Sequence, residues 1–95
     1  MPIENRFPES QALCDDSSLM RRKQVEQQCG YSRSTIYLRI AQGLFPAAVR
    51  LGARAVAWPS REVRAVNAAR IAGKSDSDIR ALVVQLATAR TVAHG

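Results

Sequence analysis

A short run of polar and basic residues, 32–39, has the side-chain types that can contact base edges and phosphates. Ser32 is a good N-cap for a helix over residues 33–42, and Ile36 and Ile40, four residues apart, predict its buried face. The opposite face then carries hydrogen-bond donors, an aromatic hydroxyl and one apolar group suited to a thymine methyl. These side chains are Arg33, Ser34, Tyr37, Leu38 and Arg39. A helix with such a face can enter the major groove of DNA.

Arg33 is the best candidate for a base contact, because a guanidinium can pair with guanine through two hydrogen bonds. Thr35 and the amides beside Ser32 lie at the positive end of the predicted helix and could hold a phosphate there. The alternative is a capped helix turn that only faces solvent. The run of four residues from Ser32 is too short to decide between the two interpretations.

A second basic group surrounds a predicted hairpin tip at Gly52-Ala53. Arg50 and Arg54 flank this tip, where a basic wing can contact phosphates or the minor groove. The alternative is a surface hairpin whose arginines serve solubility. Arg22 and Lys23 lie in the same basic segment, residues 19–59, and are further candidates for DNA contact.

Local signals predict the elements that would position these residues. Residues 23–29 form a short helix that ends at Gly30, and the gap before the helix of residues 33–42 has the length of a helix-turn-helix corner. Phe45-Pro46 blocks further helix. Alternation over residues 48–51 and 54–58 predicts a two-stranded hairpin with Trp58 facing inward.

Two more helices follow the hairpin in the prediction. Pro59-Ser60 provides a stop and the next cap, before a third helix that ends near Gly73. Ser75 and Asp78 form a variant of the capping box, before a fourth, amphipathic helix to about Arg90. The fold class is therefore mainly α with a small β-hairpin wing: a winged helix-turn-helix plus a C-terminal amphipathic helix. The predicted organisation is a flexible acidic arm (1–18), a DNA-binding domain (19–73), and a C-terminal helix and tail (74–95).

The fourth helix carries an apolar stripe in which Ile79, Leu82 and Leu86 repeat at helical spacing. With Ala89 and Ala93 the stripe has the period of a helix-packing seam, so it either covers the domain's own core or meets another copy. Both uses can coexist if Ile79 and Val83 face inward while Leu82 and Leu86 meet a neighbour. The second use predicts cooperative binding at tandem sites. A single module buries only about 600–1,000 Å² on DNA, which rarely gives high specificity by itself, so several copies should act together.

Charge favours a polyanionic partner. The 95 residues have 14 Lys and Arg against 8 Asp and Glu, a net charge of +6. The charge is uneven: residues 1–18 carry −3, residues 19–59 carry +6, and residues 60–95 carry +3. The acidic end should therefore not contact phosphate.

Other classes of protein have less support. No apolar run is long enough to span a membrane, and the N-terminus does not resemble a signal peptide, so a cytoplasmic, nucleoid-associated protein is expected. Cys14 and Cys29 form no CxxC pair, and His94 is the single histidine, next to the C-terminus. We therefore expect no metal, no cofactor and no enzymatic activity.

Five runs along the chain closely resemble the AlpA-type prophage regulators. They are RRKQV from Arg21, CGYSRSTIY from Cys29, GLFP from Gly43, VRLG from Val49 and AVAW from Ala55. These regulators are small winged-helix proteins related to phage excisionases and to the DNA-binding part of MerR regulators. The resemblance covers about half of the chain and implies Ser32 to Arg39 as the recognition helix and Arg50 to Arg54 as the wing.

Proteins like these bind DNA as transcription regulators, or as recombination directionality factors that bend attachment-site DNA so that an integrase excises an element. The resemblance therefore implies double-stranded DNA as a partner. Further copies of the chain on DNA and a site-specific integrase are additional expected partners. Excision is the leading expectation and transcriptional control is the alternative or companion role. A protein-interaction module that uses the same fold without DNA is a weaker alternative.

Overall fold

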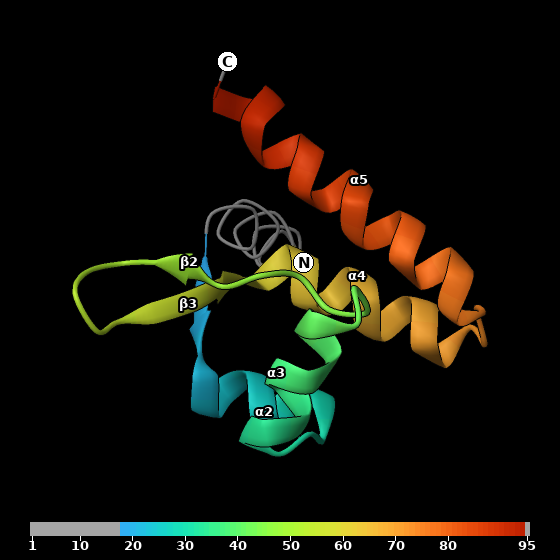
Figure 1. Ribbon diagram of the computed structural model, residues 1–95, viewed down its shortest axis with the longest axis horizontal. Helices are drawn as coiled ribbons and strands as arrows, with labels where there is room; N and C mark the ends of the chain where they lie inside the picture. The colour runs from blue at the N-terminus through green and yellow to red at the C-terminus, as the bar shows by residue number, and fades with distance from the viewer. Residues whose placement is uncertain (1–17, 95) are drawn as a thin grey trace, which may run out of the picture.

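The computed structural model describes residues 18–94 as a small helical fold with one sheet (Figure 1). In chain order the elements are β1 (Leu19–Arg21), α2 (Arg22–Cys29), α3 (Arg33–Ala41), β2 (Val49–Arg50), β3 (Val56–Pro59), α4 (Ser60–Ile71) and α5 (Asp76–His94). The fold class is as predicted: mainly helical, with a small antiparallel sheet. The predicted acidic arm lies outside the described residues, except for Ser18.

The helix pair α2 and α3 forms as the local signals predict. Gly30 has φ 72°, a left-handed conformation that favours glycine, and its N–H donates to the Glu26 carbonyl at 2.8 Å. The Ser32 Oγ accepts a hydrogen bond from the Thr35 N–H at 3.3 Å and so caps α3. Val25 of α2 and Ile36 of α3 are fully buried. The helix-turn-helix corner thus joins two helices that share one core.

The sheet has three antiparallel strands in the order β1-β3-β2. The predicted hairpin is the β2–β3 pair, with Arg50 opposite Val56, and its loop is closed by the Leu51 N–H donating to the Ala55 carbonyl at 2.8 Å. The strand β1 was not predicted. It has three residues, too few to show an alternating pattern, and it pairs with residues 57–59, far along the chain.

Trp58 is at the centre of the core, as its inward position predicts. It is fully buried, and its indole N–H donates to the Pro46 carbonyl at 2.8 Å. The rings of Phe45 and Tyr37 lie 6.3 and 6.4 Å from its ring centroid. Trp58 therefore joins the strand β3 to α3 and to the loop that follows it.

The predicted cap at the start of α4 was wrong. The N-cap is Pro59, there is no side-chain cap hydrogen bond, and Ser60 is already the first helical residue, 4% exposed. The physical reason is that β3 runs directly into α4. The Ser60 N–H continues the β1–β3 pairing by donating to the Ser18 carbonyl at 2.9 Å, so the strand pairing and the helix meet at this residue.

The helix α5 begins at a Ser75 cap, as predicted, since the Asp78 N–H donates to the Ser75 Oγ at 3.1 Å. The helix continues to His94, past the predicted end, because no Gly or Pro interrupts it before Gly95. It lies along α4 (Figure 1), and Ile79 is fully buried. No helix within residues 18–94 is long and apolar enough to cross a membrane.

The apolar stripe of α5 packs on the chain's own core. Leu82, Val83 and Leu86 are all half-buried against the core cluster. The arrangement in which Val83 faces inward while Leu82 and Leu86 turn away is therefore not what the structure shows. A role of Leu82 and Leu86 in assembly on DNA stays a prediction.

An ion pair ties α5 to the rest of the fold. The Glu62 side chain of α4 is 1% exposed and accepts two hydrogen bonds from Arg90, at 2.8 Å from Nε and 2.6 Å from a terminal nitrogen. The same terminal nitrogen donates to the Ala47 carbonyl at 2.8 Å. Nearer the start of α5, the Arg80 Nε donates to the Gln42 carbonyl at 2.9 Å. Both arginines hold α5 against the segment that joins α3 to the hairpin.

Candidate nucleic-acid interface

One face of α3 is open to solvent along its whole length. Arg33, Ser34, Tyr37 and Leu38 are exposed, with Tyr37 at 41% and Leu38 at 54%. Successive residues of a helix are about 100° apart, which places these four side chains within about 140° of one another. Four of the five predicted base-reading residues therefore share one surface.

Arg39, the fifth, lies elsewhere. It is half-buried, its guanidinium carbon lies 5.8 Å from the centroid of the Tyr31 ring, and its Nε has no hydrogen-bond partner among the described residues. A guanidinium over an aromatic face is held by a cation–π interaction. Arg39 therefore packs on the helix-turn-helix corner and not on the open face of α3.

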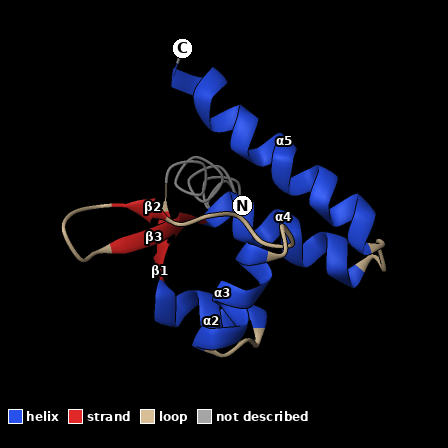
Figure 2. Cartoon of the chain, viewed as in Figure 1, coloured by secondary structure: helices blue, strands red, loops and turns tan. Residues whose placement is uncertain are grey.

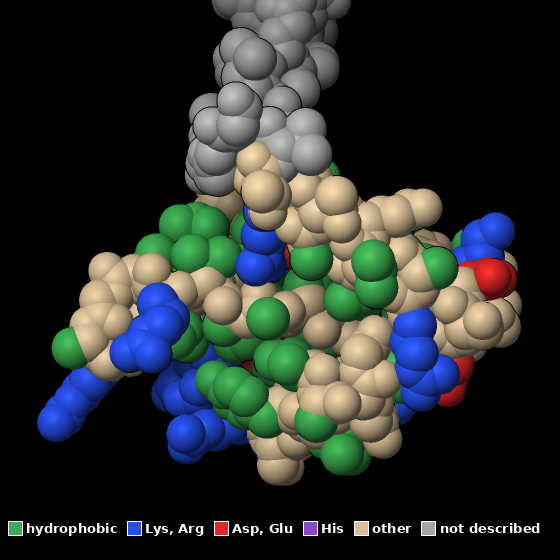
Figure 3. All heavy atoms as spheres, turned by 45° about the horizontal axis from the view of Figure 1, so that its top comes forward, with side chains coloured by type: hydrophobic (Ala, Val, Ile, Leu, Met, Phe, Trp, Pro, Cys, Tyr) green, Lys and Arg blue, Asp and Glu red, His purple; other side chains and the backbone are tan. Residues whose placement is uncertain are grey.

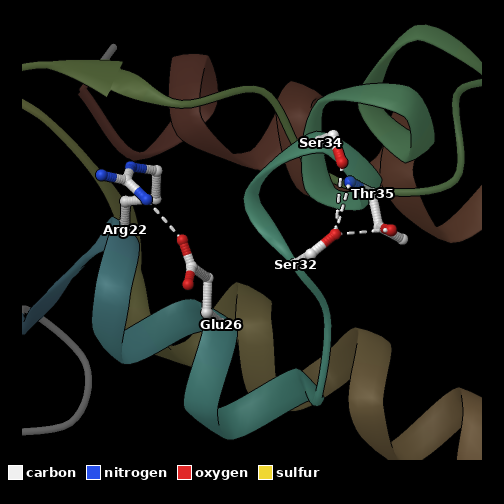
Figure 4. A network of polar contacts seen from close by, with 5 residues as sticks. All are labelled: Arg22, Glu26, Ser32, Ser34 and Thr35. Carbon is white, nitrogen blue, oxygen red and sulfur yellow. Dashed lines mark hydrogen bonds and ion pairs between the residues drawn. The ribbon is translucent and has the colours of Figure 1, made fainter.

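Thr35 is engaged within the cap of its own helix (Figure 4). Its N–H donates to the Ser32 Oγ, and the two hydroxyl oxygens are 2.9 Å apart. The Ser34 hydroxyl lies 3.3 Å from the Ser32 hydroxyl. The structure thus assigns Thr35 to the support of α3, with Ser32 and Ser34 exposed beside it.

Ser32→Ala is expected to lower the free energy of unfolding by about 1 kcal/mol, because the first turn of α3 loses its cap. Urea denaturation measures the loss. Ser32→Asp, which keeps a cap acceptor, should recover most of it, and Ser77→Ala, at an exposed position in the first turn of α5, is the matched control. Equal losses in Ser32→Ala and Ser77→Ala would contradict the role of the cap.

The hairpin forms a wing that reaches away from the helices (Figure 2). Arg50 and Arg54 are exposed on it, as is Leu51, at 46%. Figure 3 shows many of the visible Lys and Arg side chains gathered on the left, where the wing lies. Basic side chains thus gather on the side of the molecule where the wing lies.

A hollow of about 350 Å³ lies where the wing meets the start of α2. It is lined by Arg21, Arg22, Lys23, Arg54 and Val56. No acidic residue occupies the first turn of α2, although Arg22 forms an ion pair with Glu26 one turn on (Figure 4). The structure therefore brings the predicted Arg22 and Lys23, at the start of α2, together with Arg54 of the hairpin loop.

Sequence reasoning missed Arg21 as a member of this group. The residue ends β1, the strand that gave no local signal, and it pairs with Ala57 of β3. That pairing places it beside the wing. Its own N–H donates to the Gln24 Oε1 at 2.9 Å, which fixes the start of α2. The RRK run from Arg21 to Lys23 was the available signal.

The described residues contain no cluster of three or more His, Cys, Asp or Glu side chains that could hold a metal ion. Cys29 is a free, half-buried thiol. Burial raises its pKa, because burial penalises the thiolate, and a hydrogen bond with Asn67 opposes this effect. Cys29 is therefore a protonated, structural residue at neutral pH.

Comparison with known proteins agrees with the resemblance seen in the sequence. The model of the family described as prophage CP4-57 regulatory protein (AlpA) matches residues 18–70, more than half of the chain. An uncharacterized protein, ORF88, of Enterobacteria phage P4 is 51% identical over 55 residues, which cover 58% of this chain and 62% of that protein. The matched region thus spans less than two thirds of the length of this relative. No solved structure matches the chain. The chain belongs to the AlpA family of prophage regulatory proteins.

Proposed function

We propose that this protein binds double-stranded DNA at specific sites, with α3 in the major groove and the wing on the adjacent backbone or minor groove. The observation that carries the proposal is the open face of α3, where Arg33, Ser34, Tyr37 and Leu38 are exposed together. Such a face combines hydrogen-bond donors for base edges with an apolar group for a thymine methyl. The basic wing beside it supplies charge for the phosphates.

The proposed role is that of an excision factor of a prophage or integrative element, acting in the bacterial cytoplasm beside a site-specific integrase. The described residues, 18–94, share one core. Such a small protein can act on DNA by occupying a site or by bending it. An accessory protein in recombination at an attachment site acts in these two ways.

Transcriptional control is the second candidate, and the description of the family as regulatory proteins favours it. The same DNA contacts serve both roles, so one protein can carry out both. A binding site that lies between an attachment site and a nearby promoter would allow one bound protein to serve both roles.

Footprinting on the attachment site and on the neighbouring promoters of the element that encodes the protein tests both roles. An excision assay with the element's integrase, with and without the protein, is the functional counterpart. Protection of the attachment site with stimulated excision is the expected result. Protection of promoters alone, with excision unchanged, would contradict the excision role and favour the regulatory one.

Arg50→Ala and Arg54→Ala are each expected to weaken binding to all DNA sequences alike. Each lost phosphate contact should make the slope of log K against log salt shallower by about 0.9, because fewer counterions are released. Titrations at several salt concentrations measure the slope, with Lys74→Ala as a control at an exposed position between α4 and α5. A slope that neither arginine variant changes would remove the wing from the interface.

A further inference from the structure

We propose that the hollow between the wing and the start of α2 is a binding site for one phosphate of the DNA backbone, held jointly by Arg21 and Lys23 on one side and Arg54 on the other. This proposal rests on the proposed function. It adds a site whose residues come from two separate parts of the fold, including Arg21.

The lining of the hollow favours a polyanion over a small organic ligand. Binding sites for small molecules are mostly apolar with a few polar groups, whereas four of the five lining residues here are Arg or Lys. Arg22 is paired with Glu26, but within residues 18–94 no ion pair involves Arg21, Lys23 or Arg54, and all three residues are exposed. Three positive groups thus face a common space without a carboxylate among the lining residues.

The start of α2 adds to this attraction. The first amides of a helix have no partner within it and carry partial positive charge, and no acidic side chain in the first turn offsets that charge. Val56 supplies the remaining wall. An apolar wall beside cationic groups suits a sugar that adjoins a phosphate. The volume of about 350 Å³ has room for both.

The position of the hollow explains why one phosphate would contact Arg21 and Lys23 as well as Arg54. The wing and the helix pair meet there, and the β1–β3 pairing, with Arg21 opposite Ala57, fixes the distance between them. A DNA strand that contacts both the wing and the start of α2 would cross this junction. The bound phosphate would then set the angle at which the wing lies on the DNA.

The test uses the full chain and a duplex selected by the protein from a random library, synthesised with one uncharged methylphosphonate linkage at each position in turn. The wild-type protein should lose affinity about ten-fold or more at one linkage, since hydrogen bonds to a charged group are lost there. Arg21→Gln should bind the all-phosphate duplex more weakly and show a smaller further loss at that linkage than the wild type, because one of the three cations that hold the phosphate is already gone. Arg54→Gln should show a reduced loss at the same linkage.

Lys74→Gln, which removes an exposed charge outside the hollow, should behave as the wild type. Lys23→Gln is the second variant from the α2 side, should Arg21→Gln disturb the start of that helix. Two results would overturn the single-phosphate site and leave DNA binding intact. In the first, the affinity losses from the variant and from the methylphosphonate add at every linkage. In the second, the Arg21 and Arg54 variants show non-additive losses at different linkages. A wild-type protein that binds no duplex would overturn the proposed function and this site with it.

Discussion

Arg33→Ala is expected to reduce the preference for a specific duplex over a scrambled one by about 5- to 150-fold, because a guanidinium paired with guanine contributes about 1–3 kcal/mol of discrimination. Affinity for scrambled DNA should change far less, since the phosphate contacts remain. Competition binding with both duplexes measures the two affinities.

The control for Arg33→Ala is Arg50→Ala, a change of the same size on the wing. It should lower both affinities in parallel, because phosphate contacts carry no sequence information. If Arg33→Ala also lowered both affinities in parallel, Arg33 would be a phosphate contact and its assignment to a base would be wrong.

Arg90→Ala is expected to lower the free energy of unfolding by about 3 kcal/mol, the lower end of the range for breaking a buried ion pair. Glu62, 1% exposed, would be left as a buried carboxylate without its partner, although Arg90 itself is 27% exposed. Urea denaturation measures the change. The loss should exceed that in Arg80→Ala, where a single hydrogen bond from an exposed arginine is removed.

A double variant distinguishes the loss of the Glu62–Arg90 ion pair from a general destabilisation of α5. Glu62→Met with Arg90→Met replaces both charges by apolar groups and should be more stable than Arg90→Ala, because no unpaired charge remains buried. Equal stability of the Arg90→Ala and Arg80→Ala proteins would mean that the Glu62 pair does not hold α5.

The helix-turn-helix could be predicted because its signals are local. Gly30, the Ser32 cap and the spacing of Ile36 and Ile40 each act within one or two turns of helix. The inward position of Trp58 followed from alternation along a strand. Its partners, the Pro46 carbonyl and two aromatic rings, depend on the tertiary fold.

The parts that sequence reasoning missed depend on contacts between distant residues. The strand β1 exists because Leu19–Arg21 pairs with β3, and only that pairing places Arg21 beside the wing. Arg39 was assigned to the open face of α3, yet it lies about 240° around the helix from Arg33, so helical geometry alone argued against it. The Tyr31 ring that receives it comes from the preceding corner.

The stripe on α5 illustrates a different limit. The spacing of Ile79, Leu82 and Leu86 predicts that one face of the helix is covered, but periodicity cannot say by what. The structure supplies the answer for the single chain, since these residues pack on its own core. Self-assembly on DNA is a separate property that this packing does not require.

The central claim is that the exposed face of α3 reads bases in the major groove. Methylation interference on a duplex selected from a random library tests it most directly, because methylation of guanine N7 blocks contacts in that groove and leaves the phosphates unchanged. Our account predicts at least one guanine whose methylation weakens binding of the wild-type protein but no longer matters for Arg33→Ala. A folded protein that selects no common sequence, or whose binding is insensitive to N7 methylation at every guanine, would contradict it.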